Sequence, residues 1–208
     1  MIAALQSSDV RIVLASASTA RVRILRGAGL AVTVRPAPID EAAVKDAIRA
    51  GSGDMAAGDV AVILAQAKAA SASEADPAAL VVGADQVLSL DDRIFDKPSS
   101  MDEARETLVV LRGRTHHLHT AVACARGGEV IWHHQSEASL TMRDFSNEFL
   151  GRYLAAAGET VLASVGAYQM EGPGAHLFSK VDGDYFTILG LPLLPLLEYL
   201  RTERILVT

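Results

Sequence analysis

The stretch that decides the fold is VVGADQVLSLDDRIFDKP, residues Val81–Pro98. It begins as an apolar run rich in β-branched residues, which predicts a buried strand. Asp85 stands where we expect that strand to emerge, and Gln86 follows it. Two aspartates are expected to turn the chain into a short second strand, after which comes Lys97. Carboxylates alternating with an ammonium group suit a site that handles phosphate with a metal ion. The alternative is a core strand followed by a solvated turn.

Upstream, a strand and a helix are predicted to meet at a run of small hydroxyl residues. Val10–Ala15 is the expected strand, and helical spacing of apolar residues begins after Arg21. Ser18 is a suitable N-cap. Free N–H groups and the helix dipole favour an anion there, and Arg21 can add a guanidinium. The alternative is an ordinary capped strand–helix unit in which Arg21 is exposed.

Two further charged residues are candidates for the same chemistry. Glu41 precedes the expected helix 42–50, where it either complements the helix dipole or takes part in binding a divalent cation. Lys68 lies at the edge of the apolar face of the helix that contains Val60 and Leu64. Its ammonium group is expected either to reach water along the helix surface or to point into a cleft.

Composition limits the class of protein. The 208 residues are half hydrophobic, which suits one α/β domain over residues 1–208, with two lobes sharing a sheet. A net charge of −6 argues against a nucleic-acid binder. The lone Cys124 excludes a disulfide framework, and no apolar run reaches the length of a membrane span. Because no signal peptide is recognised, we expect a cytoplasmic protein without a membrane partner.

The second half of the chain predicts alternating strands and helices. A capping box at Ser100 opens a helix, strands 115–125 and 130–142 form a hairpin, and a strand and loop are expected over Ser164–Gly174, which contains Glu171. Gly190 precedes the last helix. Five histidines lie on the two hairpin strands, but adjacent strand residues point to opposite faces, so we do not expect them to bind a metal.

Several separated stretches together resemble one family, in the order that the family has them. The chain resembles the Maf family of nucleoside triphosphate pyrophosphatases over nearly its whole length. The stretches that carry the resemblance are LASASTAR (14–21), IDE (39–41), LAQAKA (64–69), VVGADQV (81–87), KP (97–98), GRTHHLHT (113–120), the GAY…EG loop (166–172) and GDYFTILGLPL (183–193).

The resemblance implies a fold and an activity. The expected fold is an elongated mixed β-sheet with flanking helices and two lobes around a nucleotide cleft. The expected reaction is the cleavage of a nucleoside triphosphate to a monophosphate and pyrophosphate with a divalent metal, Mg²⁺ or Mn²⁺. A homodimer is also suggested by the family.

The resemblance also assigns roles to individual residues. Asp85 matches the catalytic acid of the family, the base that takes a proton from the attacking water, and it is a metal-side carboxylate together with Glu41. The phosphate-binding cradle is assigned to the guanidinium and ammonium groups of Arg21, Lys68 and Lys97 and to the N–H groups around Ser16 and Ser18.

Three positions bear on the choice of base. Family members that take thymidine or uridine nucleotides have Thr at the position of Gln86 and Gln at that of Glu171, whereas the 7-methyl-GTP pyrophosphatase branch has Gln and Glu. A carboxylate can accept from both N–H groups of a guanine edge, so we expect a guanine nucleotide, 7-methylated. Ala20 departs from the pattern, because relatives carry Arg or a large aromatic residue there.

Other functions remain open on the sequence alone. One is a dTTP/UTP pyrophosphatase of the same family. Another is a nucleotide-binding regulator of septum formation without turnover. A third is an α/β domain that binds some other phosphorylated metabolite.

Overall fold

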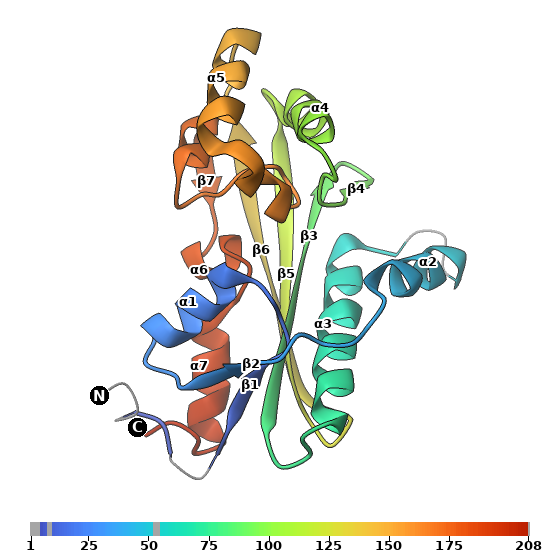
Figure 1. Ribbon diagram of the computed structural model, residues 1–208, viewed down its shortest axis with the longest axis vertical. Coiled ribbons are helices and arrows are strands. Elements are labelled where there is room, and N and C mark those ends of the chain that lie inside the picture. The colour runs from blue at the N-terminus through green and yellow to red at the C-terminus, as the bar shows by residue number, and fades with distance from the viewer. Residues whose placement is uncertain (1–4, 8–9, 52–54, 208) are drawn as a thin grey trace. The chain divides into compact units, whose positions relative to one another are not determined.

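The computed structural model describes residues 5–7, 10–51 and 55–207. Within them, seven strands form one sheet in the order β2-β1-β3-β5-β6-β7, and β4 pairs with β3 (Figure 1). Strand β1 is parallel to β2 and β3, whereas the pairs β3–β4 and β6–β7 are antiparallel. The strands are β1 (Ile12–Leu14), β2 (Val32–Val34), β3 (Leu80–Leu90), β4 (Arg93–Phe95), β5 (Thr115–Arg126), β6 (Glu129–Met142) and β7 (Phe178–Asp182).

Helices flank this sheet, so the predicted α/β class with a mixed sheet is confirmed. In the part of the chain that the structure describes, no helix combines the length and the apolar character that crossing a membrane requires. The helices are α1 (Thr19–Gly27), α2 (Glu41–Gly51), α3 (Ala57–Glu74), α4 (Met101–Leu111), α5 (Asn147–Ala157), α6 (Tyr185–Ile188) and α7 (Leu193–Thr202), with 3₁₀ turns η1 (Gly158–Ala163) and η2 (Pro173–Leu177).

The chain divides into two compact units. The first contains the described residues of 1–85, 120–136 and 190–208, and the second contains 86–119 and 137–189. Strands β3, β5 and β6 each contribute one part to either unit. Asp85 is the last residue of the first unit along β3, and Gln86 is the first residue of the second.

In the first unit, helix α3 packs very closely on strand β3. A Cβ atom at Gly83 would lie 2.3 Å from the backbone oxygen of Ala65 and 2.6 Å from the backbone nitrogen of Ala69. Real Cβ atoms do not approach backbone this closely, so only glycine permits the contact. Helices α1 and α7 lie on the other side of the strands (Figure 1). There Trp132 of β6 stacks on Tyr199 of α7, with ring centroids 4.6 Å apart.

The second unit has a core of its own. One continuous apolar cluster joins helices α4 and α5 to strands β3, β5 and β6. The side chains of Leu108, Leu150, Leu88 and Leu140 are fully buried in it. Their burial follows the spacing that the sequence shows, every second residue along the strands and every third or fourth along the helices.

Side chains cap helices α1, α4, α5 and α6, and the caps at Ser18 and Ser100 are the ones that the sequence predicts. The hydroxyl groups of Ser18, Ser100 and Ser146 accept a backbone N–H from the first turns of α1, α4 and α5. Asp184 caps the short helix α6 in the same way, through the backbone N–H of Thr187. Each cap satisfies a donor that the helix itself cannot pair.

Two expectations about local structure are wrong. Asp85 does not mark the end of the buried strand, because the extended segment that follows it belongs to the same strand, β3, which runs to Leu90 and pairs there with β4. The expected strand in Ser164–Gly174 is absent; this segment consists of turns and the start of η2. Two of its glycines allow close contacts that a side chain would prevent. A Cβ atom at Gly166 would lie 2.3 Å from the ring of Tyr168, and one at Gly174 would lie 2.4 Å from the backbone oxygen of Gln169.

His116 is fully buried in the second unit. Its Nε2 atom lies 2.8 Å from the hydroxyl oxygen of Tyr168, and its Nδ1 atom is the one buried side-chain polar atom without a partner in the described residues. Burial lowers the pKa of His116 from 6.5 to about 4, and the neighbouring His117 acts in the same direction. The folded protein therefore holds this imidazole in its neutral form.

The stability of the protein is expected to fall with decreasing pH because of this histidine. The pKa is lower in the folded than in the unfolded chain, so the unfolded chain binds the proton first as pH falls from 6.5 toward 4. Between pH 7 and pH 5 the free energy of unfolding should drop by about 2 kcal/mol from this group. Urea unfolding followed by circular dichroism measures it. The His116→Leu variant should lose that part of the pH dependence, whereas replacing the exposed His133 with Gln should keep it.

Candidate functional site

The loop between β1 and α1 forms one wall of the candidate site. The backbone N–H of Ser18 donates to the Ser16 hydroxyl oxygen over 3.2 Å, and the Ser18 hydroxyl in turn caps helix α1. Ser16 and Ser18 are half-buried, and Ala20 follows them in the first turn of the helix. The predicted strand–hydroxyl–helix arrangement is therefore present at this point of the chain.

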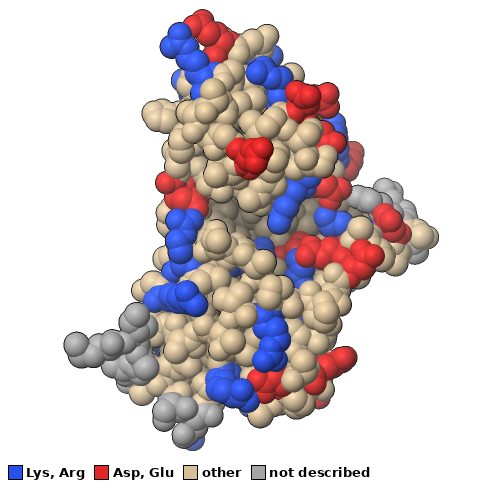
Figure 2. Space-filling view, viewed as in Figure 1, with Lys and Arg blue, Asp and Glu red and all other residues tan. Residues whose placement is uncertain are grey.

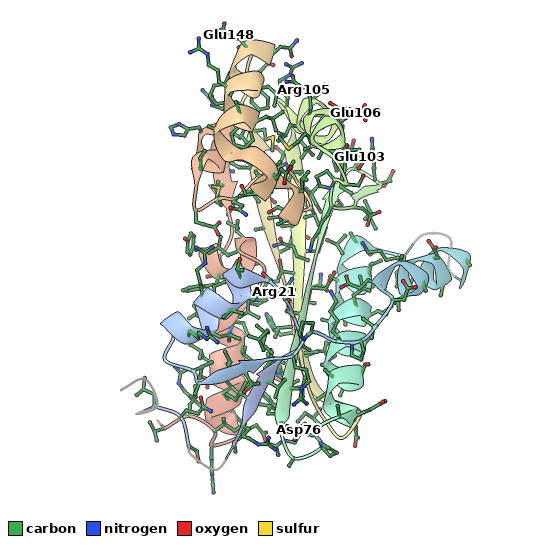
Figure 3. The ribbon with its side chains drawn as sticks, viewed as in Figure 1. Arg21, Asp76, Glu103, Arg105, Glu106 and Glu148 are labelled. Atoms are coloured by element: carbon green, nitrogen blue, oxygen red, sulfur yellow. The ribbon has the colours of Figure 1, made fainter. Side chains whose placement is uncertain are left out.

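Arg21 connects this loop to two distant segments of the first unit. Its Nη1 atom donates to the Ser16 hydroxyl oxygen over 3.1 Å and to the backbone oxygen of Ala84 over 2.8 Å. Its Nε atom donates to the backbone oxygen of Gly190 over 2.7 Å. Arg21 points from the start of α1 toward the strands (Figure 3). The side chain is 9% exposed, so the alternative of an exposed Arg21 is wrong.

The electrostatic surroundings of Arg21 offset part of the cost of burying its charge. Burial lowers the pKa of the guanidinium, while the carboxylates of Asp85 and Glu41 act in the opposite direction. A buried cation is tolerated where opposite charges and hydrogen bonds compensate it. Arg21 is thus held by backbone carbonyls, and the negative charges of two carboxylates stabilise its positive charge.

Lys68 forms the centre of a second charged cluster, on the other wall of the first unit. Its ammonium nitrogen lies 2.6 Å from Asp85 Oδ1 and 2.9 Å from Glu41 Oε2. The side chains of Lys68 and Asp85 are 8% and 10% exposed, whereas that of Glu41 is 51% exposed. The alternative in which Lys68 reaches water along the helix surface is therefore wrong, because its ammonium group points inward.

The close contact of α3 and β3 explains why Lys68 reaches Asp85. Gly83 lets the helix backbone approach the strand beside Ala65 and Ala69, and Asp85 follows Gly83 by two residues on the same face of β3. Lys68 lies next to Ala69 on the helix. The two-residue spacing between Gly83 and Asp85 thus places the Asp85 carboxylate beside the ammonium group of Lys68.

The formal charges of Asp85 and Glu41 balance those of Arg21 and Lys68, so the net charge of these four side chains is zero. Asp85 Oδ1 accepts from Lys68, but no described residue donates to Asp85 Oδ2, and that atom is not among the fully buried ones. It is therefore able to accept a proton or to contact a cation. On the face shown in Figure 2, lysines and arginines alternate with acidic residues, so this face carries no extended surface of one sign.

The remaining candidate residues belong to the second unit. Lys97 follows β4 and is exposed, and Glu171 is exposed in the turns before η2. Gln86 directly follows Asp85, and its Nε2 atom donates to the backbone oxygens of Thr187 and Ile188 over 3.0 and 3.1 Å. The structure thus brings Asp85 to Lys68, as predicted for a shared site, while the contribution of Lys97 stays a prediction.

Four backbone partners were not predicted from the sequence. The backbone oxygens of Ala84 and Gly190 accept from Arg21, and those of Thr187 and Ile188 in α6 accept from Gln86. Every residue has a backbone carbonyl, so the sequence does not indicate which of them accepts a hydrogen bond from a distant side chain. The indirect signal was Gly190 itself, which has a positive φ of 97° and would bring a Cβ within 3.5 Å of Arg21 Nε.

Histidines of the hairpin strands contact hydroxyl and carboxylate groups. In the described ranges no group of three or more His, Cys, Asp or Glu side chains is arranged to hold a metal ion. His119 instead lies 2.9 Å from the Ser89 hydroxyl and 3.3 Å from Glu137, which also contacts His117. Cys124 is buried, and burial raises the pKa of its thiol, so it is not a nucleophile.

The chain has close relatives among known proteins. A family model described as Maf-like protein matches residues 11–203. Over 195 residues the chain is 51% identical to a 7-methyl-GTP pyrophosphatase of Brucella abortus, covering 94% of this chain and 97% of the relative. It is 53% identical over 194 residues to a nucleoside triphosphate pyrophosphatase of Paramagnetospirillum magneticum, covering 93% and 99%. A 7-methyl-GTP pyrophosphatase of Mesorhizobium japonicum is 50% identical over 192 residues, covering 92% and 96%.

Removing the shared ammonium group is expected to destabilise the protein strongly. The Lys68→Met variant leaves the Asp85 carboxylate buried without its cation, which typically costs about 3–5 kcal/mol. The double variant Lys68→Met/Asp85→Asn should recover part of this loss, because the uncompensated charge is gone. Urea unfolding at neutral pH measures the differences. As a control, Arg152→Met removes an exposed ion pair with Glu148 and should cost less than about 1 kcal/mol. Equal losses of unfolding free energy in Lys68→Met and Arg152→Met would contradict a stabilising role of the buried ammonium group.

Proposed function

The chain belongs to the Maf family, and we propose that it hydrolyses a guanine nucleoside triphosphate, 7-methylated, with Asp85 as the general base. The relatives that are 51% and 53% identical over nearly the whole chain carry the names of nucleoside triphosphate pyrophosphatases. The products of this class of hydrolase are the nucleoside monophosphate and pyrophosphate. The observation that carries the proposal is the buried pair of Asp85 and Lys68 beside the Ser16–Arg21 loop.

The proposed reaction needs a base and a set of positive groups. Water attacks the α-phosphorus, its proton passes to Asp85 Oδ2, and the bond between the α-phosphorus and the bridging oxygen breaks to release pyrophosphate. Asp85 Oδ2 accepts no hydrogen bond from a described residue, while Oδ1 is held by Lys68. A carboxylate held at one oxygen presents the other in a fixed direction, which favours proton transfer.

A divalent cation fits the donor set of this region. Glu41 Oε2 and Asp85 Oδ1 both lie within 3 Å of one ammonium nitrogen, so their carboxylates are close neighbours. Mg²⁺ is commonly bound by one or two carboxylates together with substrate phosphates and water, so a site with two protein carboxylates suits it. We propose that Glu41 and Asp85 hold Mg²⁺ or Mn²⁺. Such an ion would neutralise phosphate charge and lower the pKa of bound water.

The charge balance supports a metal-bound substrate. Arg21 and Lys68 are already matched by Glu41 and Asp85, so the cluster offers little net positive charge to a bare triphosphate. A triphosphate that carries a divalent cation brings less negative charge and adds a partner for the two carboxylates. Lys97 is proposed as a further phosphate contact on the family resemblance, as are the N–H groups around Ser16 and Ser18.

The choice of base is proposed from two residues of the second unit and from the relatives. Gln86 and Glu171 match the 7-methyl-GTP branch, and two of the relatives above carry that name. A carboxylate such as that of Glu171 suits guanine because it accepts from two neighbouring N–H groups, and methylation at N7 adds positive charge to the base. Ala20 offers no stacking or polar group, so Glu171 carries more of the selectivity in this proposal. The runner-up is a preference for dTTP and UTP.

Replacing the proposed base tests the catalytic role of Asp85. Asp85→Asn keeps the shape of the side chain and an oxygen for Lys68 but cannot take a proton, so turnover should fall at least about a hundredfold. Pyrophosphate release measures turnover, and a thermal melt establishes that the variant is folded. Asp92→Asn, in the exposed turn after β3, is the control and should retain wild-type turnover. Full activity in Asp85→Asn would rule out this role.

A comparison of nucleotides tests the substrate. We expect kcat/KM to be highest for 7-methyl-GTP, lower for GTP and lowest for UTP and dTTP, all with Mg²⁺. Glu171→Gln should reduce the preference for 7-methyl-GTP over UTP by about tenfold, the effect of one charge-assisted hydrogen bond. A preference of the wild type for UTP and dTTP would support the runner-up instead. Nucleotide binding without pyrophosphate release would favour a regulator of septum formation.

A further inference from the structure

Two buried hydrogen bonds from neighbouring elements of the second unit hold the loop of residues 164–174. The Tyr153 hydroxyl of α5 donates to the backbone oxygen of Ala167 over 3.0 Å. The next residue, Tyr168, has its hydroxyl oxygen 2.8 Å from Nε2 of His116 on β5. All three of these polar side chains are buried. Two successive residues of the loop are thus anchored, one to a helix and the other to a strand.

The hydrogen bond between Tyr168 and His116 has a defined direction. In the part of the chain that the structure describes, the Tyr168 hydroxyl has no acceptor other than Nε2 of His116. Tyr168 therefore donates, and the proton of the neutral imidazole lies on Nδ1. The rings of Tyr168, His116 and Phe178 pack on one another, with centroids 4.8 to 6.0 Å apart. Moving Tyr168 out of this cluster would leave a buried hydroxyl without an acceptor, which opposes displacement of the loop.

The backbone of the loop is strained next to this anchor. Ala167 has a positive φ of 57°, a conformation that residues with a side chain rarely adopt. Such a conformation persists only where surrounding contacts enforce it, and it is common beside groups that contact a ligand. Here the contacts are the hydrogen bond from Tyr153 and the packing of Gly166, where a Cβ atom would lie 2.3 Å from the Tyr168 ring. The surrounding side chains thus hold the loop in a conformation that its own backbone does not favour.

Glu171 is the third residue of a tight turn that begins directly after Tyr168. The backbone N–H of Gly172 donates to the backbone oxygen of Gln169 over 3.2 Å, which closes the turn. Met170 packs against the apolar core of the unit, whereas Glu171 is exposed. Only two residues separate the anchored Tyr168 from Glu171, and a connection this short does not absorb a shift of the anchor. A displacement of Tyr168 is therefore passed on to the Glu171 carboxylate.

We propose that His116, acting through Tyr168, is a positioning residue for Glu171, and that this hydrogen bond sets how strongly the protein prefers a guanine base. The inference rests on the proposed function, in which Glu171 contacts the base. A carboxylate that accepts from two neighbouring N–H groups must lie in line with both, and a misplacement of about 1 Å weakens both hydrogen bonds. The position of Glu171 therefore affects discrimination between bases more than the chemistry at the α-phosphorus.

The experiment uses the full chain and measures a selectivity ratio, kcat/KM for 7-methyl-GTP divided by kcat/KM for UTP, both with Mg²⁺. Tyr168→Phe removes one hydroxyl and keeps the ring, and it should lower this ratio about fivefold. His116→Leu should do the same, whereas His116→Gln, whose amide oxygen can accept from Tyr168, should stay within about twofold of the wild type. Tyr199→Phe, which removes a phenol hydroxyl from the first unit, is the matched control and should keep the wild-type ratio. A variant that only destabilises the fold lowers kcat/KM for both nucleotides alike and leaves the ratio unchanged.

A double-mutant cycle tests whether the pair acts through Glu171. Glu171→Gln alone should lower the ratio about tenfold. If Tyr168 acts by holding the carboxylate, adding Tyr168→Phe to that variant should change the ratio by less than about twofold further. A loss of about fiftyfold in the double variant, the product of the two single effects, indicates independent contributions and would overturn the inference.

Amide hydrogen exchange gives a second readout that needs no nucleotide. In Tyr168→Phe the amides of residues 164–174 should exchange at least about threefold faster than in the wild type, while those of α3 keep their rates. An unchanged selectivity ratio, or unchanged exchange in the loop, refutes the inference and leaves the proposed hydrolysis intact. If His116→Leu does not fold, the contrast between Tyr168→Phe and Tyr199→Phe decides.

Failure of the proposed function is visible separately, in the wild type. If the wild type releases no pyrophosphate from 7-methyl-GTP, the proposed function is refuted and the role of His116 in base choice falls with it. The exchange measurement then decides alone whether His116 and Tyr168 hold the loop.

Discussion

The buried ammonium group of Lys68 constrains how helix α3 packs on strand β3 in the first unit. Taking an ammonium and a carboxylate out of water is costly, and the cost is offset only when both lie in contact. Contact requires α3 to approach β3 within backbone distance, which Gly83 and the small residues of α3 allow. The ion pair of Lys68 and Asp85 thus depends on the close packing of Gly83 against Ala65 and Ala69. A change in any of these residues affects the others.

The parts of this molecule that depend on neighbouring residues in the chain could be predicted from the sequence. Ser18 and Ser100 act as caps because a cap needs only the next three residues, and the hairpin after β3 follows from its two aspartates. The position of Asp85 in the interior of β3 was not predictable from the run alone, because β4 extends the pairing beyond it.

Contacts to the backbone of distant segments could not be predicted either. Arg21 was expected to offer its guanidinium to an anion, whereas three of its hydrogen bonds go to Ser16, Ala84 and Gly190. Gln86 was expected to read a base, and both N–H bonds of its amide go to the C-terminus of α6. The residue types alone do not tell which of their atoms remain for a ligand, because that depends on tertiary packing.

The stack of Trp132 on Tyr199 gives the protein a built-in optical reporter. Trp132 is the only tryptophan in the sequence, and it lies in the first unit, on the part of β6 that packs against α7. Its fluorescence emission therefore responds to loss of that contact and is insensitive to events confined to the core of α4 and α5. An emission transition that precedes or follows the loss of helical signal would reveal that the two units melt as separate cooperative blocks.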